Sequence, residues 1–204
     1  MSSLQHPSQI IKSQDTVIKV GSLAAGKRVP IASAVSSAGV IAALPTTNVP
    51  SVMTFLGGVT NASIAYNDGE QEYYVLGGGG FADSVKTTRR IVASITSYLQ
   101  RDFDDALQND AFSESMEAVT AGRQDLNHEV YVQIFKNIGG TSSDLVFDTI
   151  LFCATVANYQ ESYPADNLVE VTFDLASRGE IAIGKFTATS QTDPRPANQG
   201  ADQD

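Results

Sequence analysis

A chain of 204 residues, 42% of them hydrophobic and 18% charged, is long enough to fold around one substantial core and too apolar to be disordered. Its formal net charge is −10, from 23 acidic and 13 basic residues. Such a chain repels phosphate, so ordinary nucleic-acid binding is disfavoured, although repulsion would let DNA pass close by without being gripped. The start MSSLQHPSQ lacks the apolar core of a signal peptide, and no run approaches the ~20 apolar residues of a membrane helix. We therefore expect synthesis in a reducing cytosol.

The first third of the chain predicts short strands joined by loops. Residues 1–14 are polar and are expected to form an N-terminal arm. Thr16–Val20 and Gly39–Leu44 are strand candidates, and Pro45 ends the second. Val52–Phe55 is a third candidate.

A strand at Ser63–Tyr66 is followed by Asn67-Asp68-Gly69, which predicts a tight turn because these residues tolerate positive φ. Glu72–Leu76 is then the next strand. The four glycines Gly77–Gly80 predict a loop, either a close approach to another subunit or simply a flexible connection.

The middle of the chain predicts one strand and one helix. Thr88–Leu99 reads as a strand with Ile91, Ala93 and Ile95 on one face. The pattern over 102–119 predicts an α-helix, with Asp102 as its N-cap and Gly122 as a suitable stop.

The last third predicts further strands. Apolar and polar residues alternate over Leu126–Phe135, which predicts a strand, and residues 137–143 predict a turn. Leu145–Val156 is apolar at both odd and even positions, which predicts a strand covered on both faces. Cys153 lies in this run and is expected to be a buried hydrophobe. Residues 168–186 alternate on either side of Ser177-Arg178-Gly179, which predicts a hairpin with one apolar and one wet, partly acidic face.

Together these elements predict a mainly β protein: an antiparallel β-sandwich or barrel-like subunit of 15–189 with one flanking α-helix. Residues 190–204 have no apolar residue beyond alanine and are expected to be a disordered tail.

No catalytic or metal site can be assembled from the sequence. The segment 21–28 (GSLAAGKR) misses the phosphate-binding loop because Arg28 stands where a Ser or Thr is needed. The two histidines, His6 and His128, have no metal-ligand spacing with Cys153, and no Ser occupies a nucleophile elbow. We therefore expect a protein that is not an enzyme and needs no cofactor.

The order of elements resembles the major tail tube proteins of tailed bacteriophages and, more distantly, the tube proteins of contractile injection systems. The resemblance covers roughly residues 50–186 and rests on pattern rather than on an invariant motif. It includes the glycine-marked strands of 55–103, the acidic-starting helix at 102–119 and EVYVQIFKNIGG at 129–140. The closest match is ATVANYQESYPADNLVEVTFDLASRGEI at 154–181.

This resemblance implies hexameric rings whose inner sheets join into a ring-wide β-barrel and stack into a hollow conduit for genome delivery. The implied partners are sister copies and other tail proteins, such as the tape measure, terminator and baseplate or tip initiator. DNA would pass without specific binding. The implied location is the virion tail, assembled in the host cytoplasm.

Two sets of residues are candidates for sites in such a tube. The lumen-facing acidic candidates are Glu170, Asp174 and Glu180, for which an ordinary solvated outer face is the open alternative. Candidates for inter-subunit contact are the glycine loop with its neighbour and the apolar pair of the arm: Gly77, Gly78, Gly79, Gly80, Phe81, Ile10 and Ile11.

A monomeric β-sandwich binding module that recognises a glycan or a protein is the alternative function. It would need a concave patch of aromatic side chains. The available tyrosines are Tyr73, Tyr74, Tyr98, Tyr131, Tyr159 and Tyr163.

Overall fold

The computed structural model describes residues 16–36, 38–56, 59–74, 82–98, 119–122, 124–125, 127–140, 144–165, 169–189 and 194, with backbone alone over 71–74 and 82–87. The elements in this part of the chain are β1 (Thr16–Ser22), the 3₁₀ turn η2 (Ala32–Ala34), β2 (Val40–Ile41), β3 (Thr54–Phe55), β4 (Val59–Tyr74), β5 (Ala82–Tyr98), β6 (Glu129–Gly140), β7 (Asp144–Ser162) and β8 (Glu170–Thr189). Residues 119–122 are helical. The mainly antiparallel β fold is confirmed.

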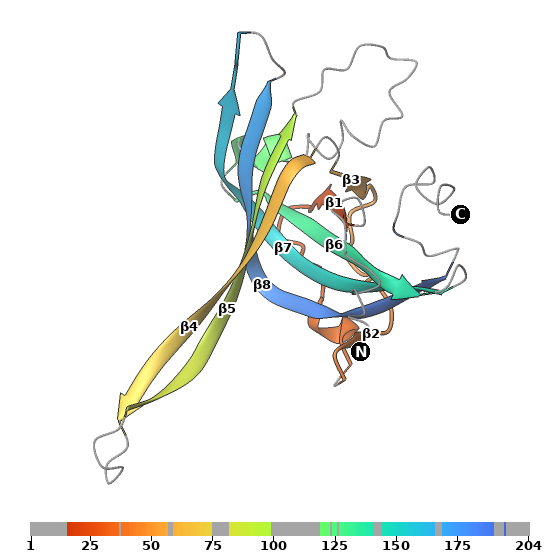
Figure 1. Ribbon diagram of the computed structural model, residues 1–204, viewed down its shortest axis with the longest axis vertical. Helices are drawn as coiled ribbons and strands as arrows, with labels where there is room; N and C mark the ends of the chain where they lie inside the picture. The colour runs from red at the N-terminus through yellow and green to blue at the C-terminus, as the bar shows by residue number, and fades with distance from the viewer. Residues whose placement is uncertain are drawn as a thin grey trace, which may run out of the picture.

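The strands form one sheet in the order β3-β1-β6-β7-β8-β5-β4, and β2 pairs in parallel with β8 off this path. β7 and β8 are 19 and 20 residues long and bend, so each contributes to two layers (Figure 1). Layer A contains β4, β5, Thr155–Ser162 of β7 and Glu170–Ala176 of β8. Layer B contains β3, β1, β6, Asp144–Ala154 of β7 and Ile181–Thr189 of β8.

The two layers pack face to face around one hydrophobic core. Layer A contributes Ile91, Ala93, Ile95, Val171, Phe173 and Leu175, and layer B contributes residues that include Ile18, Val132, Ile134, Ile150 and Phe152. The predicted face of β5 is therefore confirmed. Each fully buried large side chain contributes about 1.5–3 kcal/mol, so this interface is the main source of stability.

A second core lies on the other side of layer B. The segment between β1 and β3, which we call the covering segment (residues 23–53), places Val29, Ile31 and Ile41 on this side. Its partners from layer B include Tyr131, Phe135, Phe147, Leu151 and Cys153. Layer B is thus covered on both faces, as the apolar run of 145–156 predicted. The other side of layer A has no such cover among the described residues.

Two predicted turns are wrong. β4 runs through Asn67-Asp68-Gly69 without reversing, with a register shift between Gly69 and Glu70. β8 runs through Ser177-Arg178-Gly179, where Ala154 pairs with Ser177 and Phe152 pairs with Ile181. Residues 178–180 therefore oppose the single residue Cys153, and Gly179 absorbs the distortion at φ +80°. In both places pairing with the partner strand continues on either side of the tripeptide. In β8 the extra residues form a bulge, whereas Asn67–Gly69 pair in regular register and the extra residue of the β4–β5 ladder is Thr87 of β5.

Other boundaries also moved. The strand predicted at Gly39–Leu44 shortens to Val40–Ile41, and β6 continues through Asn137 to Gly140, where a turn was predicted. Of the predicted helix, residues 102–118 lie outside the described part, as do the arm 1–14 and most of the tail 190–204. Val119 is helical and buried, and Pro194 of the tail is buried.

Candidate functional site

The side of layer A that faces away from the core carries mostly polar side chains, and we call it the polar face. Cross-strand pairing puts Ser63 opposite Ser94 and Thr96 opposite Thr172, so one side of four adjacent strands shares this character. The members are Asn61 and Ser63 of β4, Ser94 and Thr96 of β5, Glu170, Thr172 and Asp174 of β8, and Gln160 of β7. Alternation along each strand explains why this face is wet while the opposite face is core.

Asp174 lies at the centre of the polar face in a fixed position. Ser94 Oγ donates to its Oδ1 at 2.5 Å, and Asn158 Nδ2 donates to its Oδ2 at 2.6 Å. Asn158 has φ 52°, a left-handed conformation that asparagine tolerates. Thr96 and Thr172 hydroxyls lie 3.3 Å apart in the next row. Side chains of β5 and β7 therefore hold one carboxylate of β8 facing outward.

The structure brings two of the three predicted acidic residues together. Glu170 and Asp174 share the polar face, with Glu170 opposite Tyr98. Glu180 lies in the bulge of β8, where its Oε2 accepts hydrogen bonds from the backbone N–H groups of Ile31 and Ala32, both at 3.0 Å. Glu180 thereby holds the first residues of η2 against β8.

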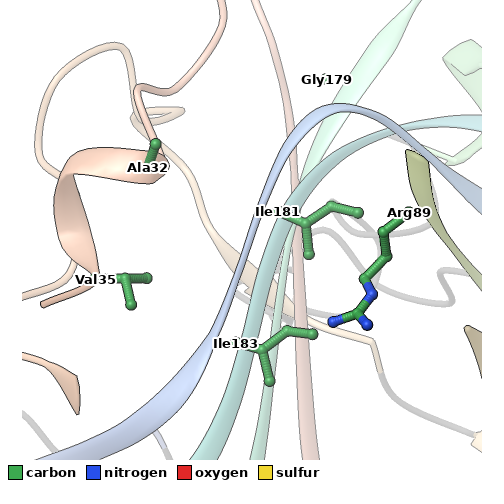
Figure 2. Close-up of a pocket in the computed structure, with 6 residues that line it drawn as sticks. All are labelled: Ala32, Val35, Arg89, Gly179, Ile181 and Ile183. Atoms are coloured by element: carbon green, nitrogen blue, oxygen red, sulfur yellow. The ribbon is translucent and has the colours of Figure 1, made fainter. Parts of the chain in front are cut away.

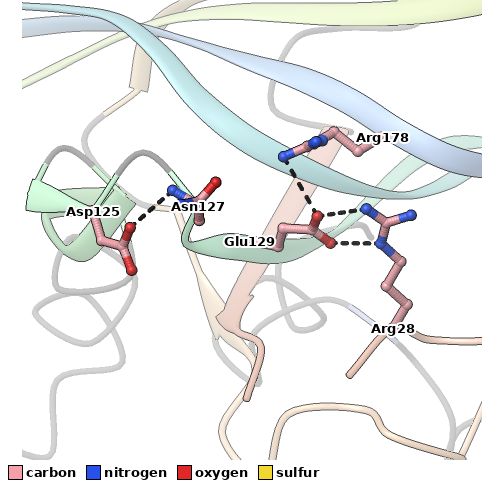
Figure 3. Close-up of polar contacts among 5 residues, drawn as sticks. All are labelled: Arg28, Asp125, Asn127, Glu129 and Arg178. Atoms are coloured by element: carbon pink, nitrogen blue, oxygen red, sulfur yellow. Dashed lines mark hydrogen bonds and ion pairs between the residues drawn. The ribbon is translucent and has the colours of Figure 1, made fainter. Parts of the chain in front are cut away.

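A second group of charges ties the covering segment to layer B (Figure 3). Arg28 Nε and Nη2 donate to the two carboxylate oxygens of Glu129 at 2.8 and 2.7 Å, and Arg178 Nη1 lies 3.7 Å from Glu129 Oε1. The hydrogen bond from Arg28 lowers the pKa of Glu129 below 4.5, against an opposing effect of burial. This ion pair was not predicted, because its partners are 101 residues apart in the sequence.

Layer A has two margins that no strand of the described chain occupies. Among the described strands, β4 pairs with β5 alone, so no described strand flanks the other edge of Val59–Tyr74. On the opposite margin, β6 reaches β7 only as far as Thr155, so no described strand flanks residues 156–162, and the helical residue Gly122 lies against Val156 at the start of this margin. A sheet edge that no strand flanks can pair with a strand of another chain.

Beyond the core, β4 and β5 continue as a two-stranded arm. β5 pairs with β8 only over Val92–Tyr98, whereas 82–91 pairs with β4 alone. Figure 1 shows this arm reaching away from both layers. The predicted contact residues Gly77–Gly80 and Phe81 follow β4 and lie outside the described residues, as do Ile10 and Ile11.

Catalytic groups do not converge in the part of the chain that is described. No group of three or more His, Cys, Asp or Glu residues there could hold a metal ion. Cys153 is buried, which raises the pKa of its thiol. Ser22 Oγ lies 2.9 Å from His128 Nε2, a pair that the sequence did not reveal, but it is exposed and no carboxylate contacts the imidazole among the described residues. No helix among the described residues is long and apolar enough to cross a membrane.

The tyrosines needed by a binding module are spread through the fold. Tyr131 is fully buried, and burial raises its pKa to about 12. Tyr159 stacks on Phe173, with ring centroids 6.4 Å apart, and packs against the core. Tyr163 is 69% exposed but lies in the segment after β7. Among the tyrosines whose side chains are described, no concave aromatic patch forms.

Comparison with known proteins supports the fold. No protein-family model matches the sequence. No curated protein matches it. Among solved structures, the chain is similar to a chain of the SPP1 tail tube, with a TM-score of 0.50 at 12% identity, covering 89% of this chain and 80% of that chain.

Two further matches come from gene transfer agent particles. One is the tail of an empty particle with C6 symmetry: 11% identity, TM-score 0.47, 84% of this chain and 97% of that chain. The other is a native virion: 12% identity, TM-score 0.42, 64% and 88%. The SPP1 likeness confirms that the chain has the fold expected from its resemblance to tail tube proteins.

Proposed function

We propose that this protein is the structural subunit of a phage tail tube, and that six copies form a ring whose A layers join into one barrel. The observation that carries the proposal is the construction of layer A. Layer A combines the polar face, an opposite face packed on the core, and two margins that no described strand flanks, in a chain with the SPP1 tail tube fold. A sheet with these properties is suited to line a water-filled bore.

The joining contact would be heterologous. The open edge of β4 in one copy would pair with the open 156–162 edge of β7 in the next, so the same contact repeats around the ring until it closes. This pairing would satisfy the backbone groups of both margins and remove the tendency of a long edge strand to aggregate. Stacking of rings uses other surfaces and does not close, so it would produce a tube.

The polar face would then line the lumen, and Glu170 and Asp174 are the acidic residues that we place there. Six copies at −10 give 6 × −10 = −60 per ring. A channel that shares the sign of DNA repels its phosphates and lets it slide. The groups that bind Asp174 are an uncharged hydroxyl and an uncharged amide. They can bind water, but they do not provide the cationic side chains that would bind phosphate. We do not place Glu180 in the lumen, because its carboxylate accepts hydrogen bonds from the backbone at the start of η2. Its lumen role stays a prediction.

In this role the partners are sister copies, a tape measure protein inside the growing tube, a terminator, and a baseplate or tip initiator. DNA passes through without specific contacts. Assembly would occur in the host cytoplasm and the product would reside in the virion tail. Catalysis and a cofactor have no part in it.

Electron microscopy of the purified protein across a concentration series tests the proposal. Rings or hollow tubes are expected at high concentration, and mass measurement by light scattering should show a multiple of six chains. A matched pair of variants tests the joining edges: a proline at the exposed Ala62, whose N–H points away from β5 to the outer edge of β4, should block assembly, whereas one at the exposed Ala42 should not. A protein that stays monomeric at every concentration, even with an initiator complex added, contradicts the proposal and favours the binding module.

A further inference from the structure

One edge of β8 has a gap between two partner strands. On this side, β5 pairs with β8 as far as Ala176, and β2 pairs with it from Lys185. The β5 backbone leaves at Ile91, whose N–H donates to Ser177 Oγ at 2.9 Å. Between these points no strand of the described chain occupies this side of residues 178–184.

The backbone groups of β8 point into this gap. Lys185 N–H donates to Gly39 O at 3.0 Å, on the side where β2 lies. Because alternate residues of a strand direct their N–H and C=O groups to the same side, those of Ile183 and Ile181 point the same way. The gap therefore offers an edge of the kind that accepts an added strand.

Side chains wall the gap on both sides. A groove of about 520 Å³ runs along it, lined by Ala32, Val35, Arg89, Gly179, Ile181 and Ile183. Figure 2 shows Ala32 and Val35 on one side of β8 and Arg89 on the other, beside Ile181 and Ile183. Arg89 is bound to Asp68 at 2.8 and 3.1 Å, so its charge is paired, and the groove offers both polar and apolar surface, the apolar part from Val35, Ile181 and Ile183.

We infer that this groove receives residues 8–12 of a second copy of the chain, added as a strand to β8. The inference rests on the self-association in the proposed function. Of the two terminal segments, 190–204 has no large apolar residue and contains two prolines, which cannot donate to a ladder. Residues 8–12 contain Ile10 and Ile11. Neighbouring residues of a strand point to opposite sides, so we place Ile11 against Val35 and Ile10 against Ile181.

The reach of the chain favours a second copy over the same molecule. Thr16 begins β1, which β6 and β7 separate from β8. A segment added beyond β8 lies four strand spacings away, about 19 Å. At about 3.3 Å per residue, crossing that distance takes about six residues. This would use residues 15 to 10 on the way and leave Ile10 and Ile11 outside the groove.

Disulfide trapping between two full-length variants tests the contact. One chain carries Ile11→Cys and the other carries Val35→Cys; the native Cys153 is buried and does not compete. Oxidation of the mixture is expected to yield a covalent heterodimer, at least tenfold more than a control mixture of Ile11→Cys with Asn61→Cys, whose site lies on the polar face. Yields equal to the control overturn the inference. So does a double variant, Ile11→Cys/Val35→Cys, that forms only the intrachain bond.

Assembly separates this inference from the proposed function. Ile10→Ser/Ile11→Ser should raise the concentration needed for rings or tubes about tenfold or more, since it removes two buried isoleucines from a contact. Leu4→Ser is the control and should assemble like the parent. If the double variant assembles at the parent concentration, the groove contact is wrong while the tube stands. If the parent never assembles, the proposed function fails.

Discussion

Replacing Glu129 with Gln tests how the covering segment is attached to layer B. Glu129 opens β6, and its carboxylate accepts two hydrogen bonds from Arg28 of the covering segment, with Arg178 of β8 close by. Gln keeps the size of the side chain but removes its charge and one acceptor oxygen. The variant therefore probes the ion pair without creating a cavity.

The expected cost follows from the exposure of the two partners. The Glu129 side chain is 14% exposed and the Arg28 side chain 51%. A hydrogen bond to a charged group contributes about 1.5–3 kcal/mol when shielded, and an exposed ion pair at most about 1 kcal/mol. A half-shielded bidentate pair lies between these values, so Glu129→Gln should lower the free energy of unfolding by about 1–2 kcal/mol. For a chain of this size, the melting temperature should fall by about 2–8 °C.

The pH dependence has a definite sign. The pKa of Glu129 in the folded protein is lowered below 4.5 by Arg28. A carboxyl with a depressed folded pKa contributes its stability above the unfolded value and loses it as the pH falls through the folded value. The gap in stability between parent and variant should therefore be full at pH 7 and shrink once the pH falls below about 4.5.

Urea unfolding at pH 7 and at pH 3 measures this gap. Asp68→Asn is the matched control, because Asp68 also holds an arginine by two hydrogen bonds with similar exposure, but within the β4–β5 arm. As a cross-strand pair between two adjacent strands, with an exposed arginine, it should cost less than the Glu129 pair. A Glu129→Gln protein as stable as its parent at pH 7, or a gap that stays unchanged at pH 3, refutes the reasoning.

Three further predictions follow from single contacts. Asp174→Leu should leave the fold intact but slow DNA release from assembled particles, whereas Asp174→Glu should retain it, as ejection assays can measure. Gly140→Ala should destabilise by about 2–4 kcal/mol in thermal unfolding, because Gly140 has φ +122° and a Cβ would lie 2.2 Å from the Asp144 carbonyl oxygen; Gly26→Ala, at φ +71° with open space around it, should cost less. The Cys153 thiol should react with a thiol reagent only at the rate of unfolding, since it is 1% exposed; rapid labelling of the native protein would contradict this.

The sequence could predict the face of Glu170 and Asp174 but not their surroundings. Strand alternation is a local property, so two residues four apart on one strand share a side. The groups that hold Asp174 come from other strands: Ser94 is 80 residues away and Asn158 is 16. The Arg28 and Glu129 pair and the groove beside β8 depend in the same way on segments that meet only after folding. No local pattern could have revealed them.

The sequence by itself determined which side of each strand is apolar, where the continuous apolar run of β7 lies, and that antiparallel β structure dominates. These features follow from side-chain order, because a strand places successive residues on opposite faces. Only the tertiary structure decided that the strands continue through Asn67–Gly69 and Ser177–Gly179 instead of turning there. The preference of each tripeptide for a turn rests on a few local contacts. Pairing with β5 or β7 continues on both sides of the tripeptide and buries apolar side chains, which stabilises the extended strand more than the turn. β7 and β8 are long enough to bend and take part in both layers. Because β6 pairs with β7 only in layer B, the bend leaves part of β7 without a neighbouring strand in layer A, and the proposed assembly depends on this margin.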